Sequence, residues 1–284
     1  MASAVEGRPG FERSQEPDQI WQVDARFAAA LREQGWPAPD AVARCFGSVG
    51  SGGEGSEGRG ATAILALPGH SERLHLRPVR HGGLLGPLWA GCILGFERPL
   101  SELRVTETLR AAGAPVPRAV SVVAHRRFGP LWEAIYATEH VEDAADGLAW
   151  LARAPSRPAR VAGARAVGAA IRRFHDAGGQ HPDLHIKNLL LRGTEPEVWV
   201  IDLDGARADA PPTPPRRMQE LMRLVRSLHK RGVAEQIGVR GLAAGFSAYC
   251  GGDRGLRGAL WRCLPREQRR MARHAWAYRG ASAA

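Results

Sequence analysis

Short apolar runs with alternating polar positions occupy much of the first half of the chain, a pattern typical of β-strands. Residues 61–67 and 74–77 predict two strands joined by a Pro-Gly turn. A second pair of strands is expected over 119–125 and 131–140. This part of the chain is therefore predicted to be rich in β-structure.

Helical spacing of apolar residues marks other segments. Residues 20–34 and 101–112 predict two amphipathic helices beside the strands. In the second half, 159–176 has a helical apolar pattern that ends at a Gly-Gly pair, and 216–231 carries one apolar face. The segment 261–276 reads as one or two basic amphipathic helices. Strands followed by helices predict an α+β protein.

A polar stretch in the second half has the residue types of a phosphoryl-transfer site. It runs His-Pro-Asp-Leu-His-Ile-Lys-Asn over 181–188, and a strand over 197–201 then leads to Asp202. In kinases one carboxylate accepts the proton of the attacking hydroxyl, while a carboxamide and a second carboxylate hold the magnesium ions. The spacing predicts Asp183 as the catalytic base and Asn188 and Asp202 as metal ligands. The alternative is an ordinary polar loop with Asp183 capping a turn.

A Gly-, Ser- and Glu-rich segment precedes the first pair of strands. Gly58 and Gly60 directly precede the first of these strands, as the glycines of a phosphate-covering loop would. The strict G-x-G-x-x-G spacing is absent, however, and a flexible linker is the competing interpretation. Arg77 stands where the second strand of a kinase carries a phosphate-binding Lys, and Glu102 is its expected ion-pair partner. The alternatives are an exposed Arg at a strand end and a Glu favoured by the helix dipole.

This layout predicts a two-lobed, protein-kinase-like fold. Residues 1–19, rich in charge, Gly and Pro, are expected to form a disordered leader. A small β-rich N-lobe is expected over 20–141 and a larger, mostly helical C-lobe over 142–284, joined by an Ala-, Gly- and Pro-rich passage at 143–158. The hinge, whose backbone holds the adenine of ATP in such a fold, is expected at 138–141 and includes Glu139.

The chain after Asp204 lacks the long segment that seats a peptide in protein kinases. It passes through a Pro-rich stretch at 210–215 and enters a helix at once. Pro182 also replaces the usual Arg of the catalytic loop. We therefore expect no protein substrate, and a small molecule or a sugar as the acceptor.

The charge balance favours an anionic partner. The formal net charge is +10 and the isoelectric point is near 10.5. Lys187 and Lys230 are the only lysines, so the basicity comes almost entirely from Arg, which a biased genome also produces. No basic motif interleaved with aromatic residues marks a nucleic-acid binder.

Cysteine usage and hydropathy indicate a cytoplasmic protein. The four cysteines show no C-x-x-C pair and no zinc spacing. No apolar run approaches the ~20 residues that span a bilayer, and the first 19 residues are too polar for a signal peptide. Tryptophans lie beside arginines from Trp261 to Trp276. This pattern predicts either peripheral contact with a membrane or a helix whose apolar face packs in the core while its charged face is exposed to solvent.

A family likeness rests on six runs of the sequence: 76–84, 113–117, 172–175, 181–191, 201–204 and 223–228. The Arg and double-Gly run at 76–84 and the Arg-Ser-Leu run at 223–228 are the more specific of them. Together these runs resemble the bacterial kinases of 3-deoxy-D-manno-octulosonic acid (Kdo), which belong to the lipopolysaccharide core kinase family.

The resemblance implies ATP- and magnesium-dependent phosphorylation of a Kdo hydroxyl in the lipopolysaccharide inner core, on Kdo-lipid A beside the inner membrane. It carries over the roles of phosphate binder to Arg77, of its partner to Glu102, of base to Asp183, and of metal ligand to Asn188 and Asp202.

Two other functions remain open on the sequence alone. One is a kinase of another small molecule, such as a sugar or an aminoglycoside, although sites for cationic substrates carry acidic residues and this chain is basic. The other is a pseudokinase scaffold, for which the missing glycine motif and an Arg at position 77 are the arguments.

Overall fold

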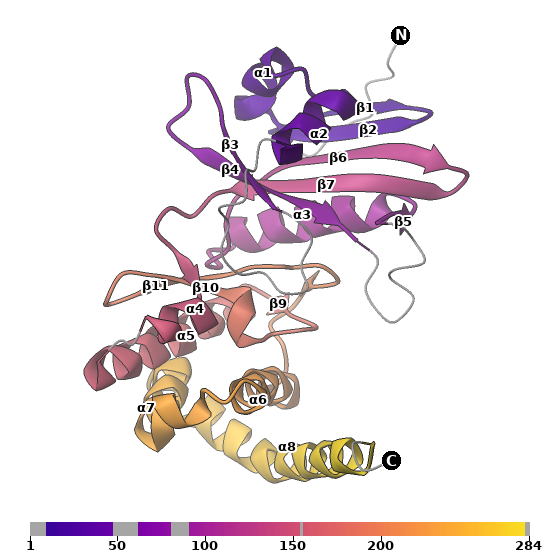
Figure 1. Cartoon of the computed structure of the whole chain (residues 1–284). Helices are drawn as coiled ribbons and strands as arrows, with labels where there is room; N and C mark the ends of the chain where they lie inside the picture. Colours follow the sequence, from indigo (N-terminus) through magenta and orange to yellow (C-terminus); the bar gives the residue numbers. More distant parts are fainter. Residues whose placement is uncertain (1–9, 48–61, 81–90, 154–155, 282–284) are drawn as a thin grey trace. The chain divides into compact units, whose positions relative to one another are not determined.

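The structure is a computed structural model that describes residues 10–47, 62–80, 91–153 and 156–281, without the side chains of 271–281. Figure 1 shows the whole chain. The chain divides into two compact units: Met1–Glu107 with Pro117–Val141, and Thr108–Val116 with Glu142–Ala284.

The first unit is built on a seven-stranded antiparallel sheet. The strands follow the order β1-β2-β6-β7-β4-β3, and β5 pairs with β7 (Figure 1). Their bounds are β1 Phe11–Glu16, β2 Gln19–Asp24, β3 Ala63–Ala66, β4 Arg73–Val79, β5 Ile93–Leu94, β6 Ala119–Phe128 and β7 Leu131–Glu139. In the β4–β7 register Arg77 lies opposite Tyr136.

Both faces of this sheet are covered by helices, because successive side chains on each strand point to opposite sides. Trp21 packs in one apolar cluster with α1 (Ala25–Glu33) and α2 (Pro39–Gly47). Its neighbour Ile20 packs in a second cluster with Leu100 and Leu103 of α3 (Glu97–Ala111). Figure 1 shows α1 and α2 on one face and α3 on the other.

Two expectations for the N-terminal segment are wrong. Residues 20–34, expected to be one helix, form β2 and then α1. Asp24 separates the two elements, because its carboxylate accepts the N–H of Arg26 at 3.0 Å and caps the helix. Residues 10–19, expected to be disordered, include β1, which pairs along β2. Residues 1–9 lie outside the described part of the chain.

The second unit is mostly helical. Its helices are α4 Gly147–Ala152, α5 Arg157–Asp176, α6 Pro214–Lys230, α7 Ala234–Cys250 and α8 Arg254–Ala281. Two small sheets, β11-β10-β8 and β12-β9, contain β8 Ala145–Asp146, β9 Gly179–Gln180, β10 Leu189–Arg192, β11 Glu197–Val200 and β12 Arg207–Ala208. The passage expected at 143–158 is thus partly ordered into β8 and α4, and Trp150 fixes α4 by donating to the Gly193 carbonyl at 3.1 Å.

Two glycines let α5 and α7 approach closely. A Cβ atom placed on Gly168 of α5 would lie 2.1 Å from the carbonyl oxygen of Gly245 on α7. Contacts this short do not occur, so only Gly fits at position 168 while the two backbones keep this spacing.

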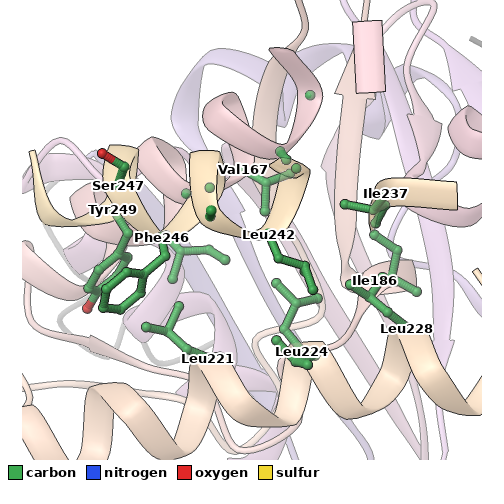
Figure 2. Close-up of a pocket in the computed structure, with 18 of the residues that line it drawn as sticks. Val167, Ile186, Leu221, Leu224, Leu228, Ile237, Leu242, Phe246, Ser247 and Tyr249 are labelled. Carbon is green, nitrogen blue, oxygen red and sulfur yellow. The ribbon is translucent and has the colours of Figure 1, made fainter. Parts of the chain in front are cut away.

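An apolar cavity of about 760 Å³ lies among α5, α6, α7 and α8. Figure 2 shows Leu221, Leu224 and Leu228 of α6 opposite Leu242 and Phe246 of α7. The leucines are three and four residues apart, so they share one face of α6. The opposite face of this helix therefore remains for polar contacts.

Candidate active site

The loop between β9 and β10 holds two of the three residues predicted for catalysis. The side-chain amide of Asn188 donates to the backbone carbonyl of Asp183 at 3.0 Å, which closes the loop on itself. Asn188 is buried at 1% exposure, whereas the Asp183 side chain is 71% exposed. His185 places its Nε2 atom 3.6 Å from the Asp183 carboxylate. The loop thus presents one carboxylate to solvent on a fixed backbone.

Asp202, the third predicted residue, is held next to this loop by backbone pairing. Leu189 of β10 lies opposite Val200 of β11, and the Ile201 N–H donates to the Asn188 carbonyl at 3.0 Å. Asp202 follows directly, with a φ of 62° in the left-handed region that non-glycine residues seldom adopt. Such a conformation costs about 1–2 kcal/mol and is typical of functional sites.

His181 joins the two parts of the site, a role that was not predicted from the sequence. Its Nδ1 atom accepts the Asp183 N–H at 3.1 Å, and its Nε2 atom lies 3.2 Å from the Ile201 carbonyl. Burial lowers the pKa of His181, so the ring is neutral, with its proton on Nε2 donated to Ile201. The His-x-Asp spacing was the sequence signal for this role.

These residues fit a magnesium ion chemically. The nitrogen of the Asn188 amide is a donor to Asp183, so its oxygen is the atom that can contact a cation. The described residues contain no cluster of three or more His, Cys, Asp or Glu that could hold a metal. A pair of oxygen ligands is nevertheless typical of Mg²⁺, which keeps several waters and binds substrate phosphates.

In the first unit, Arg77 of β4 and Glu102 of α3 form an ion pair. Glu102 is buried, with its side chain 2% exposed, and the guanidinium of Arg77 lies 5.0 Å from the centre of the Tyr136 ring. Tyr136 donates to Thr106 at 3.0 Å, and burial raises its pKa well above the usual range. Arg77 therefore has a defined position, which a phosphate-binding cation needs.

The remaining predicted nucleotide contacts have different outcomes. Gly58 and Gly60 lie outside the described residues. Glu139 is at the end of β7, and its carboxylate lies 3.7 Å from Arg118. The N–H groups of Glu139 and His140 donate to the carbonyls of Arg118 and Arg73, so neither is available to an adenine base.

The sequence matches the Lipopolysaccharide kinase (Kdo/WaaP) family over residues 54–243, which is more than half of the chain. The chain belongs to this family. The resemblance inferred from the six sequence runs is confirmed, and the strands and helices of the structure agree with the predicted α+β class. The matched range contains Arg77 and Glu102 in the first unit and the loop at 181–188 with Asp202 in the second.

Relatives in the Kdo/WaaP family come from several bacteria. A 3-deoxy-D-manno-octulosonic acid kinase of Vibrio vulnificus is 30% identical over 229 residues, covering 78% of this chain and 86% of the relative. One of Vibrio cholerae serotype O1 is 35% identical over 151 residues, covering 52% of this chain and 61% of the relative. A solved structure of WaaP in complex with acyl carrier protein is similar at 20% identity and a TM-score of 0.47, covering 81% of this chain and 94% of that chain.

Proposed function

We propose that this protein is an ATP-dependent kinase that phosphorylates a hydroxyl of Kdo in the lipopolysaccharide inner core. The observation that carries the proposal is the joining of Asp183, Asn188 and Asp202 through one network of backbone and His181 hydrogen bonds. Family membership and the names of the relatives, which are kinases of Kdo, support the choice of acceptor.

Asp183 is the residue we propose as the base. Its carboxylate is exposed, so an acceptor hydroxyl can approach within hydrogen-bonding distance. His181 accepts its backbone N–H and Asn188 donates to its backbone carbonyl, so the backbone that carries this carboxylate is held in place. A positioned base of this kind contributes roughly 10²–10⁴-fold to a transfer rate.

Asn188 and Asp202 are the residues we propose to hold Mg²⁺, and Arg77 is the proposed partner of the nucleotide phosphates. When bound, magnesium neutralises charge on the phosphates during transfer. Glu102 orients Arg77 from within the protein, and the stacking on Tyr136 restricts the guanidinium further. The planar guanidinium can donate to two phosphate oxygens through a fixed pair of N–H groups, a geometry that the compact ammonium of Lys lacks.

The segment after Asp204 supports a small acceptor instead of a peptide. It forms β12, which pairs with β9 just before the catalytic loop, and α6 begins at Pro214. The described helices include none with the length and apolar composition that crossing a membrane requires. We infer a cytoplasmic protein that meets its lipid-linked, anionic substrate at the inner face of the inner membrane.

The direct test is phosphate transfer from labelled ATP to Kdo-lipid A, with lipid A that lacks Kdo as the matched acceptor. We expect label to be transferred to Kdo-lipid A and not to lipid A that lacks Kdo. Asp183→Asn should abolish this transfer. Preferential labelling of a soluble sugar, an aminoglycoside or a peptide would overturn the choice of acceptor. ATP binding without transfer to any of them would favour the pseudokinase alternative.

A further inference from the structure

One face of α6 contacts the catalytic loop, and its residues have no part in the function proposed above. Glu220, Arg223 and Ser227 are spaced three and four residues apart, so they lie along one side of the helix. Arg223 and Ser227 also fall in the Arg-Ser-Leu run at 223–228, one of the more specific runs of the family likeness. The leucines of the same helix point into the apolar cavity instead (Figure 2).

All three polar side chains bond to the backbone of the loop. A carboxylate oxygen of Glu220 accepts the His181 N–H at 2.9 Å, and Arg223 donates to the His181 carbonyl at 3.1 Å. The hydroxyl of Ser227 accepts the Ile186 N–H at 3.1 Å. Both polar backbone groups of residue 181 and the N–H of residue 186 are thus held by a single helix, on either side of Asp183.

The hydroxyl of Ser227 is itself oriented for this contact. It donates its proton to the Leu224 carbonyl at 2.7 Å, one turn back in the helix. The lone pairs on its oxygen are then directed away from that carbonyl and are used by Ile186. A side chain that lacks the hydroxyl would leave the Ile186 N–H without this acceptor.

Glu220 is fully buried and is fixed from behind by two other helices. His175 at the end of α5 places Nε2 3.2 Å from Glu220 and Nδ1 2.7 Å from the hydroxyl of Tyr249 on α7. Arg217 donates to the same hydroxyl at 3.3 Å, so the Tyr249 proton is directed to His175. Burial lowers the pKa of His175, so its remaining proton lies on Nε2 and is donated to Glu220.

The charge of Glu220 is balanced within α6. Arg216 places its Nε atom 3.0 Å from the second carboxylate oxygen of Glu220, as an ion pair without hydrogen-bond geometry. A buried carboxylate is costly to maintain without such partners. Retaining one here provides a strong, charge-assisted acceptor for the His181 N–H, which a neutral side chain would not.

We propose that Glu220, Arg223 and Ser227 are positioning residues that hold the catalytic loop, and with it Asp183, in the geometry for phosphate transfer. The proposal rests on the proposed kinase function. Because the three residues hold backbone atoms of the loop and touch no nucleotide-binding residue described above, their loss should affect turnover more than ATP binding. Small displacements of a catalytic group reduce rates steeply, by ~10²-fold for 1 Å.

Ser227→Ala is the mildest test, because it removes one hydroxyl from a helix that tolerates Ala. We expect kcat for Kdo-lipid A to fall about tenfold while the KM for ATP stays within about twofold. Ser227→Thr keeps the hydroxyl and should retain most of the turnover. Glu220→Gln should lower kcat further, by about ten- to a hundredfold.

Glu107→Gln is the matched control. Glu107 is a buried carboxylate that accepts a backbone N–H, that of Ala119 at 2.8 Å, but it belongs to the first unit, whereas the loop belongs to the second. Its replacement should lower the melting temperature and leave kcat within about twofold. A kcat loss in this control equal to that of Glu220→Gln would reduce the proposal to general destabilisation.

A second measurement does not depend on activity. The amides of residues 181 and 186 should exchange their hydrogens faster in Ser227→Ala and Glu220→Gln, while exchange in β6 and β7 stays unchanged. Folded variants with unchanged exchange in the loop and kcat within about twofold of wild type would overturn the proposal. If the wild-type protein transfers phosphate to no acceptor, the proposed function fails, and the exchange data still decide the positioning role.

Discussion

The ion pair between Arg77 and Glu102 should respond asymmetrically to mutation, because its two members are buried to different extents. The Glu102 side chain is 2% exposed and that of Arg77 is 23% exposed. Arg77→Ala leaves a carboxylate in the protein interior without its cation. Glu102→Ala leaves a guanidinium that water reaches and that still stacks on Tyr136. Arg77→Ala should therefore be the more destabilising of the two.

The size of the effect follows from these exposures. Removing one member of a buried ion pair destabilises a protein by about 3–5 kcal/mol, whereas exposed pairs contribute about 0–1 kcal/mol. The partial exposure of Arg77 places Arg77→Ala at about 3 kcal/mol and Glu102→Ala at about 1–2 kcal/mol. The double variant loses the pair but leaves no isolated charge, so we expect a coupling free energy of about 1–2 kcal/mol.

Urea unfolding of the wild type, both single variants and the double variant measures these free energies. Asp40→Ala is the matched control, because Asp40 pairs with Arg44 on the exposed surface of α2. Its replacement should cause only a small loss of stability, well below that of Arg77→Ala. Phosphate transfer should fall in Arg77→Ala and in Glu102→Ala. Equal destabilisation by the two single variants, or simple additivity in the double variant, would refute the reasoning.

Three further outcomes test other parts of the molecule. Asp202→Ala should abolish transfer while far-UV circular dichroism stays unchanged, and retained activity would falsify the metal-ligand assignment. Gly168→Ala should destabilise the protein by about 2–4 kcal/mol in a thermal melt, because its Cβ would lie 2.1 Å from the Gly245 carbonyl oxygen. The control Gly255→Ala on α8 should be neutral or slightly stabilising in the same measurement. The KM for Kdo-lipid A should rise with salt, because the Debye length falls from ~10 Å at 0.1 M to ~3 Å at 1 M and exposed arginines are then screened from the anionic substrate. The KM should rise further in the double variant Arg269→Ala/Arg270→Ala. A KM that does not change with salt would remove the electrostatic argument.

The parts of the site that the sequence predicts well are those set by local chain geometry. Asp183 and Asn188 are five residues apart in one loop, and a short strand leads to Asp202, so their spacing along the chain largely determines where they lie. The strands β4, β6 and β7 were predicted to within a few residues, because their apolar and polar positions alternate or end at clear turns.

The N-terminal elements could not be predicted in this way. In β2, Ile20, Trp21, Gln22 and Val23 are all buried, so the strand shows no alternation of apolar and polar residues. Its apolar residues also fit a helical spacing, and only pairing with β1 and β6 distinguishes the two. That pairing involves β6, about a hundred residues further along the chain.

The contacts of Glu220 could not be predicted either. A Glu in the middle of a basic helix reads as a solvated charge, because nothing nearby in the sequence shows that its side chain is fully buried. Its partners His175 and His181, and Tyr249 that bonds to His175, come from different elements, and no local pattern brings them together. The Arg-Ser-Leu run was recognisable as a landmark, but its contacts with the loop required the structure.

The segment between Asp204 and α6 has a thermodynamic consequence for ligand binding. It is anchored by the pairing of β12 with β9 and by the Asp209 N–H, which donates to the Gly178 carbonyl at 3.2 Å. The two backbones are also in close contact, because a Cβ on Gly178 would lie 1.9 Å from the Asp209 carbonyl oxygen. Ordering a flexible backbone costs about 1–2 kcal/mol per residue at each binding event. Here that entropy is already lost on folding, so a ligand that binds against this segment loses only its own freedom of motion.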